Sequence, residues 1–497
     1  MAAKTIKSDN QEYLLRYEPL HKSITGIKGF DEITNGGLPK GRTTLFAGAA
    51  GSGKTVFGME FLVMGVVKYG EPGVLMSFEE NEKELIKNFS AIGYNINKMI
   101  GDNKLYIDYV YIERKEIEET GEFDLEGIFI RLENAIKKVG AKRVVLDTIE
   151  ALFSGISNEG ILRAEIRRLF RWLNNKGLTV IATAERGVNT FTRYGLEEYL
   201  ADCVILLDQD ISNNISTRRL RVLKYRGSEH GTNEYPFLIG KNGISVLPIT
   251  SINLEHEASS KKISTGNEKL DAMLSGGYYL GSSTLISGTA GSGKTTFANI
   301  FVNSVASGRG KALYISFEES PKQIIRNMGS VGIKMHSLIE TGKLKIMAFR
   351  PSLYGLETHL VKIIDEIENF KPDAVVIDPI SNFIIAGTLN ESKSMVTRLI
   401  DYLKTKQINS IFINLSSAGI FEETEIGVSS LMDNWLFLKD IVQNGERKHF
   451  LHILKARGSK HSNQEREFVF SSNGIILYDE NNGTAASIPI GNTTNIR

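Results

Sequence analysis

Two glycine-rich segments of the sequence have the residue types and spacing needed to bind the phosphates of a nucleotide. Both match GxxxxGK[ST], as GAAGSGKT at 48–55 and GTAGSGKT at 288–295, between a strand-like run and an apolar helix-like run. The glycines allow a tight loop whose backbone N–H groups, with the N-terminus of the following helix, face the phosphates. The residues predicted to bind ATP are Gly48, Gly51, Ser52, Gly53, Lys54 and Thr55 in the first segment and Gly288, Gly291, Ser292, Gly293, Lys294 and Thr295 in the second.

The same segments predict a magnesium site with an acidic partner further along the chain. The hydroxyls of Thr55 and Thr295 are the Mg²⁺ ligands expected in such loops, while the lysines reach the β- and γ-phosphates. The runs VVLD and VVID end at Asp147 and Asp378, each at the carboxyl end of a predicted buried strand, where open α/β sheets bind their ligands. We expect these two carboxylates to position Mg²⁺ through water.

A pair of adjacent acids follows a strand-like run in each half of the chain, within the repeated sequence SFEE. The pairs are Glu79 with Glu80 and Glu318 with Glu319. A carboxylate here can take a proton from an attacking water or hydroxyl, and its neighbour can help to orient the metal. We predict catalytic roles for all four residues and an additional metal role for Glu319.

A basic pair lies near the end of each half. These pairs are Lys224 and Arg226 in KYRG, and Lys455 and Arg457 in KARG. Side chains alternate along a strand, so the lysine and arginine of each pair share one face. We predict that both pairs bind ATP, where they can stabilise transition-state charge at the γ-phosphate. Their distance in sequence from the loops allows them to act on the nucleotide of a neighbouring subunit.

These paired motifs belong to an internal duplication of domain size. The segment from Thr25 to the first loop returns from Thr265, 240 positions later and without a gap. Short β-branched runs alternate with helix-like segments such as 81–92 and 161–176, which indicates βαβ units around a buried, mostly parallel sheet. We therefore predict an α/β fold with two tandem P-loop NTPase domains, and the predicted ranges are 1–249 and 250–479, followed by a polar tail at 480–497.

Composition excludes several classes of protein. The 59 Lys and Arg against 58 Asp and Glu give a net charge of +1, which offers no general attraction to nucleic acid or an anionic membrane. The one cysteine, Cys203, excludes an intrachain disulfide and a Cys-rich zinc site. No apolar run is long enough for a signal peptide or a bilayer span. We predict a soluble cytoplasmic protein and expect neither a membrane nor nucleic acid as a partner.

With these motifs in this order, and with TRYGLEEYLAD and EYPF in its first half, the chain resembles the KaiC family of ATPases and autokinases from about Thr25 to about Asp479. The resemblance implies RecA-like domains in a two-tiered homohexamer that binds ATP and Mg²⁺ at subunit interfaces. It implies a slow ATPase in the first domain, and a second domain that phosphorylates itself and removes the phosphate. The KYRG and KARG residues would then complete the site of the adjacent subunit. A KaiB-like protein docking on the first ring, or a sensor histidine kinase, is the implied partner.

The family's phosphoacceptor pair lies a few residues before an aspartate that starts a strand. Here that position reads VSSLMD, which assigns phosphorylation to Ser429 and Ser430 and proton abstraction to Glu318. The first half has the acids Glu197 and Glu198 there, within one residue of alignment, so only the second half can be switched by phosphate. The chain's tail is short and polar where clock-type members carry a long segment that binds an activating partner, so dependence on that activator is not implied.

Two other functions share these motifs. A RecA-type DNA-processing motor has the same loop and ring geometry, although the near-neutral charge and the absence of a long basic or glycine-rich loop speak against it. A scaffold that binds ATP without turnover would form stable hexamers with negligible ADP release. The intact acids of both SFEE sequences argue against that scaffold.

Overall fold

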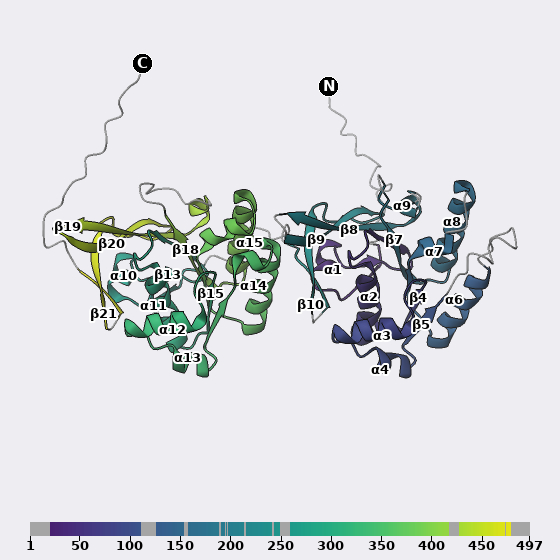
Figure 1. Cartoon of the computed structure of the whole chain (residues 1–497), viewed down its shortest axis with the longest axis horizontal. Coiled ribbons are helices and arrows are strands. Elements are labelled where there is room, and N and C mark those ends of the chain that lie inside the picture. The colour runs from purple at the N-terminus through teal and green to yellow at the C-terminus, as the bar shows by residue number, and fades with distance from the viewer. Residues whose placement is uncertain are drawn as a thin grey trace, which may run out of the picture. The chain divides into compact units, whose positions relative to one another are not determined.

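The same α/β arrangement occurs twice along the chain (Figure 1). The computed structural model describes residues 20–110, 126–153, 158–187, 190–193, 195, 197–212, 215–240, 243–248, 259–416, 427–472 and 474–478. The chain divides into two compact units, called the first and second domains below. The predicted boundary at 249/250 and the predicted tail at 480–497 lie outside the described residues.

The first domain is built on a sheet that has nine strands in its described part, in the order β11-β10-β9-β8-β3-β7-β6-β4-β5. The pairs from β8 to β5 are parallel, whereas β9, β10 and β11 pair antiparallel at the other edge. The strands of the sheet are β3 (Thr43–Gly48), β4 (Gly73–Ser77), β5 (Leu105–Tyr109), β6 (Arg143–Asp147), β7 (Thr179–Glu185), β8 (Cys203–Ser212), β9 (Ile215–Tyr225), β10 (Glu234–Gly240) and β11 (Gly243–Val246). A separate two-stranded ribbon consists of β1 (Lys22–Ser23) and β2 (Leu38–Pro39).

Helices cover both faces of this sheet because its central strands are apolar on both sides. Neighbouring residues of β3 belong to opposite cores: Phe46 packs with Phe57 of α2, and Leu45 belongs to the same hydrophobic cluster as Leu169 of α8. A parallel strand buried on both faces is expected to read as a continuous apolar run, as TTLFAG does. The helices are α1 (Phe30–Ile33), α2 (Lys54–Tyr69), α3 (Glu82–Ala91), α4 (Ile96–Gly101), α6 (Glu126–Val139), α7 (Ile149–Phe153), α8 (Glu159–Asn175) and α9 (Glu197–Leu200).

The second domain repeats this sheet in the order β16-β15-β17-β18-β14-β19-β20-β21-β22. Its strands are β14 (Ser283–Gly288), β15 (Ala312–Ser316), β16 (Leu344–Ala348), β17 (Ala374–Asp378), β18 (Asn409–Leu415), β19 (Asn434–Gln443), β20 (Glu446–Ala456), β21 (Arg466–Ser471) and β22 (Gly474–Leu477), with a ribbon of β12 (Lys262–Ile263) and β13 (Tyr278–Tyr279). Its helices are α10 (Glu268–Met273), α11 (Lys294–Ser307), α12 (Pro321–Ser330), α13 (His336–Glu340), η2 (Pro351–Leu353), α14 (Leu356–Phe370), η3 (Ile380–Ile385), α15 (Leu389–Thr405) and η4 (Ser429–Leu431). The predicted fold class, two tandem α/β domains with mostly parallel sheets, is confirmed.

The parallel register brings the motif-bearing strand ends to one edge of each sheet. Ser77, which opens SFEE, pairs with Asp147, and Ser316 pairs with Asp378. The strands that lead into the phosphate loops lie two places from the aspartate strands in the sheet order: β3 from β6, and β14 from β17. Their carboxyl ends lie on the same side of the sheet. In the part of the chain that the structure describes, no helix combines the length and apolarity needed to cross a membrane.

Candidate active sites

Each glycine-rich segment forms a loop between a buried strand and a helix that begins at the motif lysine. Lys54 Nζ donates to the carbonyls of Gly48 at 2.9 Å and Ala49 at 3.0 Å. Lys294 Nζ donates to the carbonyls of Gly288 at 2.9 Å and Thr289 at 2.6 Å. Burial lowers the pKa of the Lys294 ammonium to about 8, against the opposing charge of Asp378. Both lysines are therefore held by their own loop, facing the space where phosphates would bind.

The shape of both loops fits a phosphate group. Gly51 and Gly291 have φ of 75° and 81°, and a Cβ atom placed on either would meet nothing within 4 Å, so open space borders the backbone there. The Oγ atoms of Ser52 and Ser292 are buried without a hydrogen-bond partner in the described structure. Backbone N–H groups at the start of α2 and α11 have no partner within their helices and carry the positive end of the helix dipole. These features form a cradle for an anion.

The two strand-terminal aspartates lie against the threonine of each loop. Thr295 Oγ1 donates to Asp378 Oδ2 at 2.9 Å, and Thr55 donates to Asp147 in the same way. Burial raises the pKa of both carboxyls, although these hydroxyl donors lower it in part. A hydroxyl beside a carboxylate is the oxygen donor set that Mg²⁺ takes when phosphates supply the remaining ligands. The pairs Thr55 with Asp147 and Thr295 with Asp378 thus fit the predicted metal role.

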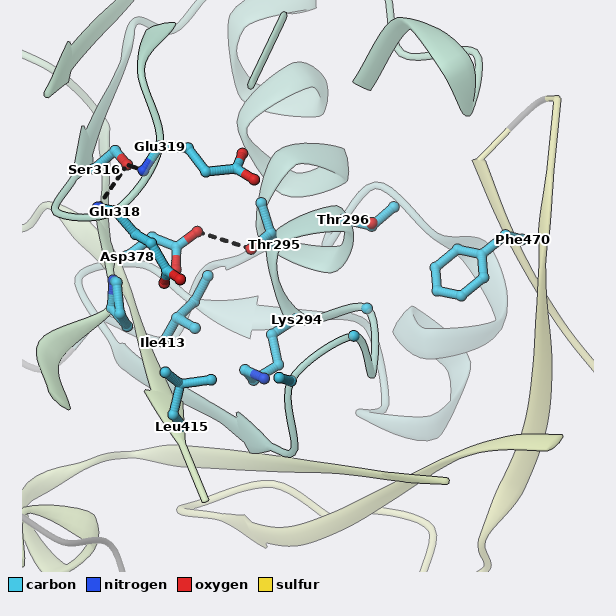
Figure 2. A pocket seen from close by; sticks show the side chains of 14 residues that line it. Lys294, Thr295, Thr296, Ser316, Glu318, Glu319, Asp378, Ile413, Leu415 and Phe470 are labelled. Atoms are coloured by element: carbon cyan, nitrogen blue, oxygen red, sulfur yellow. Dashed lines mark hydrogen bonds between the residues drawn. The ribbon is translucent and has the colours of Figure 1, made fainter. Parts of the chain in front are cut away.

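The SFEE segments turn back over this edge of the sheet. Ser316 Oγ accepts the backbone N–H groups of Glu318 at 3.3 Å and Glu319 at 2.9 Å, which fixes the turn. Figure 2 shows the Glu318 side chain beside Asp378, while the Glu319 side chain lies apart and accepts a hydrogen bond from Asn327 Nδ2 at 3.3 Å. In the first domain, Ser77 anchors the turn and Glu80 accepts from Asn88 Nδ2 at 2.9 Å. The first acid of each pair is therefore the one placed at the Asp–Thr pair.

A cavity of about 300 Å³ joins these groups in the second domain. It is lined by Ala290, Gly291, Gly293, Lys294, Thr295, Thr296, Ser316, Glu318, Glu319, Asp378, Pro379, Ile413, Leu415 and Phe470. The loop, the aspartate and both glutamates predicted from the sequence are thus brought together, whereas Lys455 and Arg457 are absent from this lining. Arg457 lines a different cavity of about 440 Å³ that also contains Lys404 and Asp433.

The basic pairs instead bind the backbone of the predicted acceptor segment. Lys455 Nζ donates to the carbonyls of Ser429 and Ser430, both at 3.1 Å, and Arg457 Nη2 donates to Ser430 O at 2.6 Å. Burial, and then the positive charge of Arg457, lowers the pKa of Lys455. An anion at this pair would relieve that repulsion.

The same bonds in the first domain fix the alignment of the two copies. Lys224 Nζ donates to the carbonyls of Glu198 at 3.0 Å and Tyr199 at 3.3 Å, and Arg226 Nη2 donates to Tyr199 O at 3.2 Å. Glu198 therefore corresponds to Ser429, and Tyr199 corresponds to Ser430. The sequence paired the serines with Glu197 and Glu198 within one residue of alignment, and these backbone bonds fix the pairing at Glu198 and Tyr199.

Sequence reasoning missed several side chains that complete these sites. The carboxylate of Asp147 accepts the hydroxyl of Thr183 from β7, whereas that of Asp378 accepts the hydroxyl of Tyr314 from β15. Thr148 Oγ1 donates to Glu79 Oε1 at 2.9 Å. Thr148 directly follows Asp147, and this position beside a motif residue was the sequence feature that could have identified it. Nothing local in the sequence distinguishes Thr183 or Tyr314 from other residues of buried strands.

Known proteins share sequence with both domains of the chain. A family profile described as the KaiC ATPase covers residues 23–251 and 263–482. The chain belongs to the KaiC family. Membership in this ATPase family implies nucleotide binding.

Among KaiC relatives, the circadian clock protein KaiC2 of Synechocystis sp. is 53% identical over 476 residues, which cover 95% of this chain and 83% of the relative. The circadian clock oscillator protein KaiC of Parathermosynechococcus lividus is 35% identical over 93% of this chain and 86% of its own length. KaiC of Synechococcus elongatus is 34% identical over 96% of this chain and 92% of its own length. The predicted resemblance to KaiC is confirmed across nearly the whole chain.

Proposed function

We propose that this KaiC-family ATPase is also a serine autokinase and autophosphatase, in which the second domain transfers the γ-phosphate of ATP to Ser429 or Ser430. The observation that carries the proposal is the pairing of a complete loop–Asp–Glu site with a hydroxyl-bearing segment bound by Lys455 and Arg457. The equivalent segment of the first domain has Glu198 in place of Ser429. In this proposal, the first domain hydrolyses ATP and has no acceptor serine.

Each group has a role that follows from its position. The loop 288–295 holds the phosphates, and Lys294 neutralises charge on the β- and γ-phosphates. Thr295 and Asp378 would hold Mg²⁺, and the metal would supply charge neutralisation at those phosphates. Glu318 takes the proton of the serine hydroxyl. At the same time the bond between the serine Oγ and the γ-phosphorus forms, and the bond between that phosphorus and the ADP oxygen breaks. Glu319 accepts a hydrogen bond from Asn327 and lies apart from Asp378, so its catalytic and metal roles stay predictions.

The basic pairs act across a subunit boundary in this proposal. Lys455 and Arg457, like Lys224 and Arg226, would reach the γ-phosphate held by an adjacent copy in a homohexamer. The absence of Lys455 and Arg457 from the cavity of the second domain supports a role for this pair outside that cavity. The names of the relatives support a clock-type or related signalling role. In this proposal, a KaiB-like protein or a sensor histidine kinase reads the phosphorylation state. A cytoplasmic location stays a prediction.

Incubation with Mg·ATP labelled in its γ-phosphate tests this function. The wild-type chain is expected to incorporate label and to release ADP. The double variant Ser429→Ala/Ser430→Ala is expected to release ADP without incorporating label, since its loops and acids are unchanged. Hydrolysis by the wild type without any incorporation would contradict the autokinase and leave an ATPase. Absence of both ADP release and label would favour the non-hydrolysing scaffold.

A DNA-processing motor is the alternative, and the match to KaiC proteins over both domains does not favour it. The motor predicts salt-dependent binding of single-stranded DNA and DNA-stimulated hydrolysis. We expect the rate of ADP release to be the same with and without single-stranded DNA. A several-fold, salt-sensitive stimulation would overturn the proposed function.

A further inference from the structure

The cavity of the second domain has two chemically different ends. Figure 2 shows Glu318 and Asp378 on one side of the phosphate loop, and the ring of Phe470 on the other side, beyond Thr296. The carboxylates, with Thr295, form the metal end. The Phe470 end has an aromatic ring and no charged group among the residues that line the cavity.

The position of the metal end sets the direction of a bound nucleotide. In the proposed function, the γ-phosphate lies near Glu318, Asp378 and Thr295, where transfer occurs. The loop binds the phosphate chain between the two ends, so the α-phosphate, ribose and base must extend toward Thr296 and Phe470. The ring therefore lies where the nonphosphate part of the ligand would emerge.

Phe470 is exposed toward this space and is held in place from behind. Its side chain is 38% exposed, a high value for a large apolar residue that lines a cavity. A Cβ atom placed on Gly293 would lie 2.9 Å from Cζ of the ring, so the ring reaches the backbone of the loop itself. His449 and Phe468 contact the ring in edge-to-face arrangements with centroids 5.1 Å and 5.8 Å away, and a 2.8 Å hydrogen bond to Asp440 fixes His449.

The first domain differs at both of these positions. A Cβ atom on Gly53 would lie 2.9 Å from Cδ1 of Ile239, so Ile239 occupies the place of Phe470. The strand registers agree, since Ile239 pairs with Ile244 and Phe470 pairs with Ile475. Val56 likewise takes the place of Thr296 in the helix after the loop. The first site thus has two aliphatic side chains where the second has a ring and a hydroxyl.

We propose that Phe470 is a stacking platform for the nucleotide base in the second domain, and that its absence from the first domain makes the two sites unequal in affinity. This inference rests on the proposed function, because the direction of the nucleotide follows from it. Stacking on an aromatic ring is strong for any base, since every base has a π-face. Phe470 therefore raises affinity for purine nucleotides without choosing between adenine and guanine.

Equilibrium titration of the full chain carrying Lys54→Ala tests this proposal, because that background leaves only the second site to bind. The probes are the nonhydrolysable analogues AMP-PNP and GMP-PNP, and tripolyphosphate, which lacks base and ribose. Phe470→Ile should weaken both analogues about tenfold and leave tripolyphosphate binding unchanged. Phe470→Trp should retain tight binding. Tyr478→Ile, which removes an exposed ring outside the cavity, is the matched control and should change nothing.

The first site provides the reciprocal test. In a Lys294→Ala background, Ile239→Phe should tighten AMP-PNP binding several-fold. The inference is overturned if Phe470→Ile leaves the affinity for AMP-PNP unchanged, or weakens tripolyphosphate equally, since the ring would then only shape the loop. Failure of the Lys54→Ala parent to bind AMP-PNP at all would instead overturn the proposed function, and this inference with it.

Discussion

The two domains hold the first glutamate of SFEE differently. In the first domain, the hydroxyl of Thr148 donates to Glu79 at 2.9 Å. In the second, Pro379 occupies the place of Thr148, and within the described part of that domain the carboxylate of Glu318 has no hydrogen-bond partner. A restrained carboxylate suits one small nucleophile such as water, whereas an unrestrained one can meet a serine hydroxyl carried on another segment. The difference follows the proposed division into hydrolysis and phosphoryl transfer.

A second difference lies behind the loop helix. Glu60 of α2 is buried, and its Oε2 accepts the backbone N–H of Ile244 at 2.7 Å. The corresponding residue of α11 is Ile300, which packs near Gly474 in the same place. Burial raises the pKa of the Glu60 carboxyl to about 7. The first domain therefore carries a titratable group in a core position that is apolar in the second.

The largest expected effect comes from removing either loop lysine. Lys294→Ala should reduce nucleotide affinity of the second domain at least about a hundredfold and abolish phosphorylation of the chain, because the charge that neutralises the β- and γ-phosphates is lost. Lys54→Ala should instead remove most ADP release. Label incorporation and ADP release, measured on both variants, separate the domains. Equal loss of both activities in each variant would contradict independent roles.

Glu318→Gln should slow phosphoryl transfer by about a hundredfold or more, because an amide cannot accept the serine proton. Glu79→Gln is the matched control, since it makes the same change in the first domain. It should slow hydrolysis and leave the initial rate of incorporation intact. Initial rates with γ-labelled ATP measure both. Unchanged incorporation in Glu318→Gln would remove Glu318 from the chemistry.

The buried Glu60 carboxyl should make the stability of the first domain depend on pH, and the second domain has no such group at this position. The folded state holds this proton more tightly than the unfolded chain, so stability falls as the pH rises from about 4.5 to about 7. Glu60→Gln, which stays neutral and still accepts from Ile244, should remove the part of this fall that Glu60 causes and stabilise the first domain above pH 7 by about 3 kcal/mol. Cys203, the single cysteine, is buried in β8 and reports unfolding of this domain alone when it becomes accessible to a thiol reagent.

Urea titrations at several pH values, each followed by a labelling pulse at one fixed pH, give the required midpoints. Glu60→Gln and wild type should coincide near pH 4.5 and diverge toward pH 8. If the urea midpoints of the two proteins differ by the same amount at every pH in this range, the Glu60 carboxyl does not carry the burial cost assigned to it.

Thr148→Val should have the smallest effect. The substitution keeps the shape of the side chain and removes the donor to Glu79, so ATP hydrolysis by the first domain should fall about fivefold through loss of orientation. Steady-state ADP release in the Lys294→Ala background measures it. Phosphorylation in an otherwise wild-type chain should not change. An unaltered hydrolysis rate would mean that the Thr148 bond does not distinguish the two glutamates.

Local patterns in the sequence predicted much of the fold and the places of the two loops. The run TTLFAG is β3 itself, and the helix expected at 81–92 is found as α3 at Glu82–Ala91 with the Asn81 side chain capping its N-terminus. The duplication also placed each loop, aspartate and SFEE pair at one edge of a parallel sheet. These features depend on short-range periodicity and on the common direction of parallel strands.

Features set by long-range register could not be predicted in this way. Tyr314 reaches Asp378 from a neighbouring strand, and Phe470 reaches the loop through the pairing of β20, β21 and β22. Such contacts follow from which strands pair and at which residue, and neither is encoded by local spacing.

Peptide-resolved mass spectrometry of the wild-type chain after incubation with Mg·ATP tests the central claim most directly. The account predicts phosphate on the peptide that contains Ser429 and Ser430, and none on the corresponding segment of the first domain, where Tyr199 carries a hydroxyl at the place of Ser430. Phosphate on Tyr199, or an unmodified chain that still releases ADP, would contradict the assignment of phosphoryl transfer to the second domain.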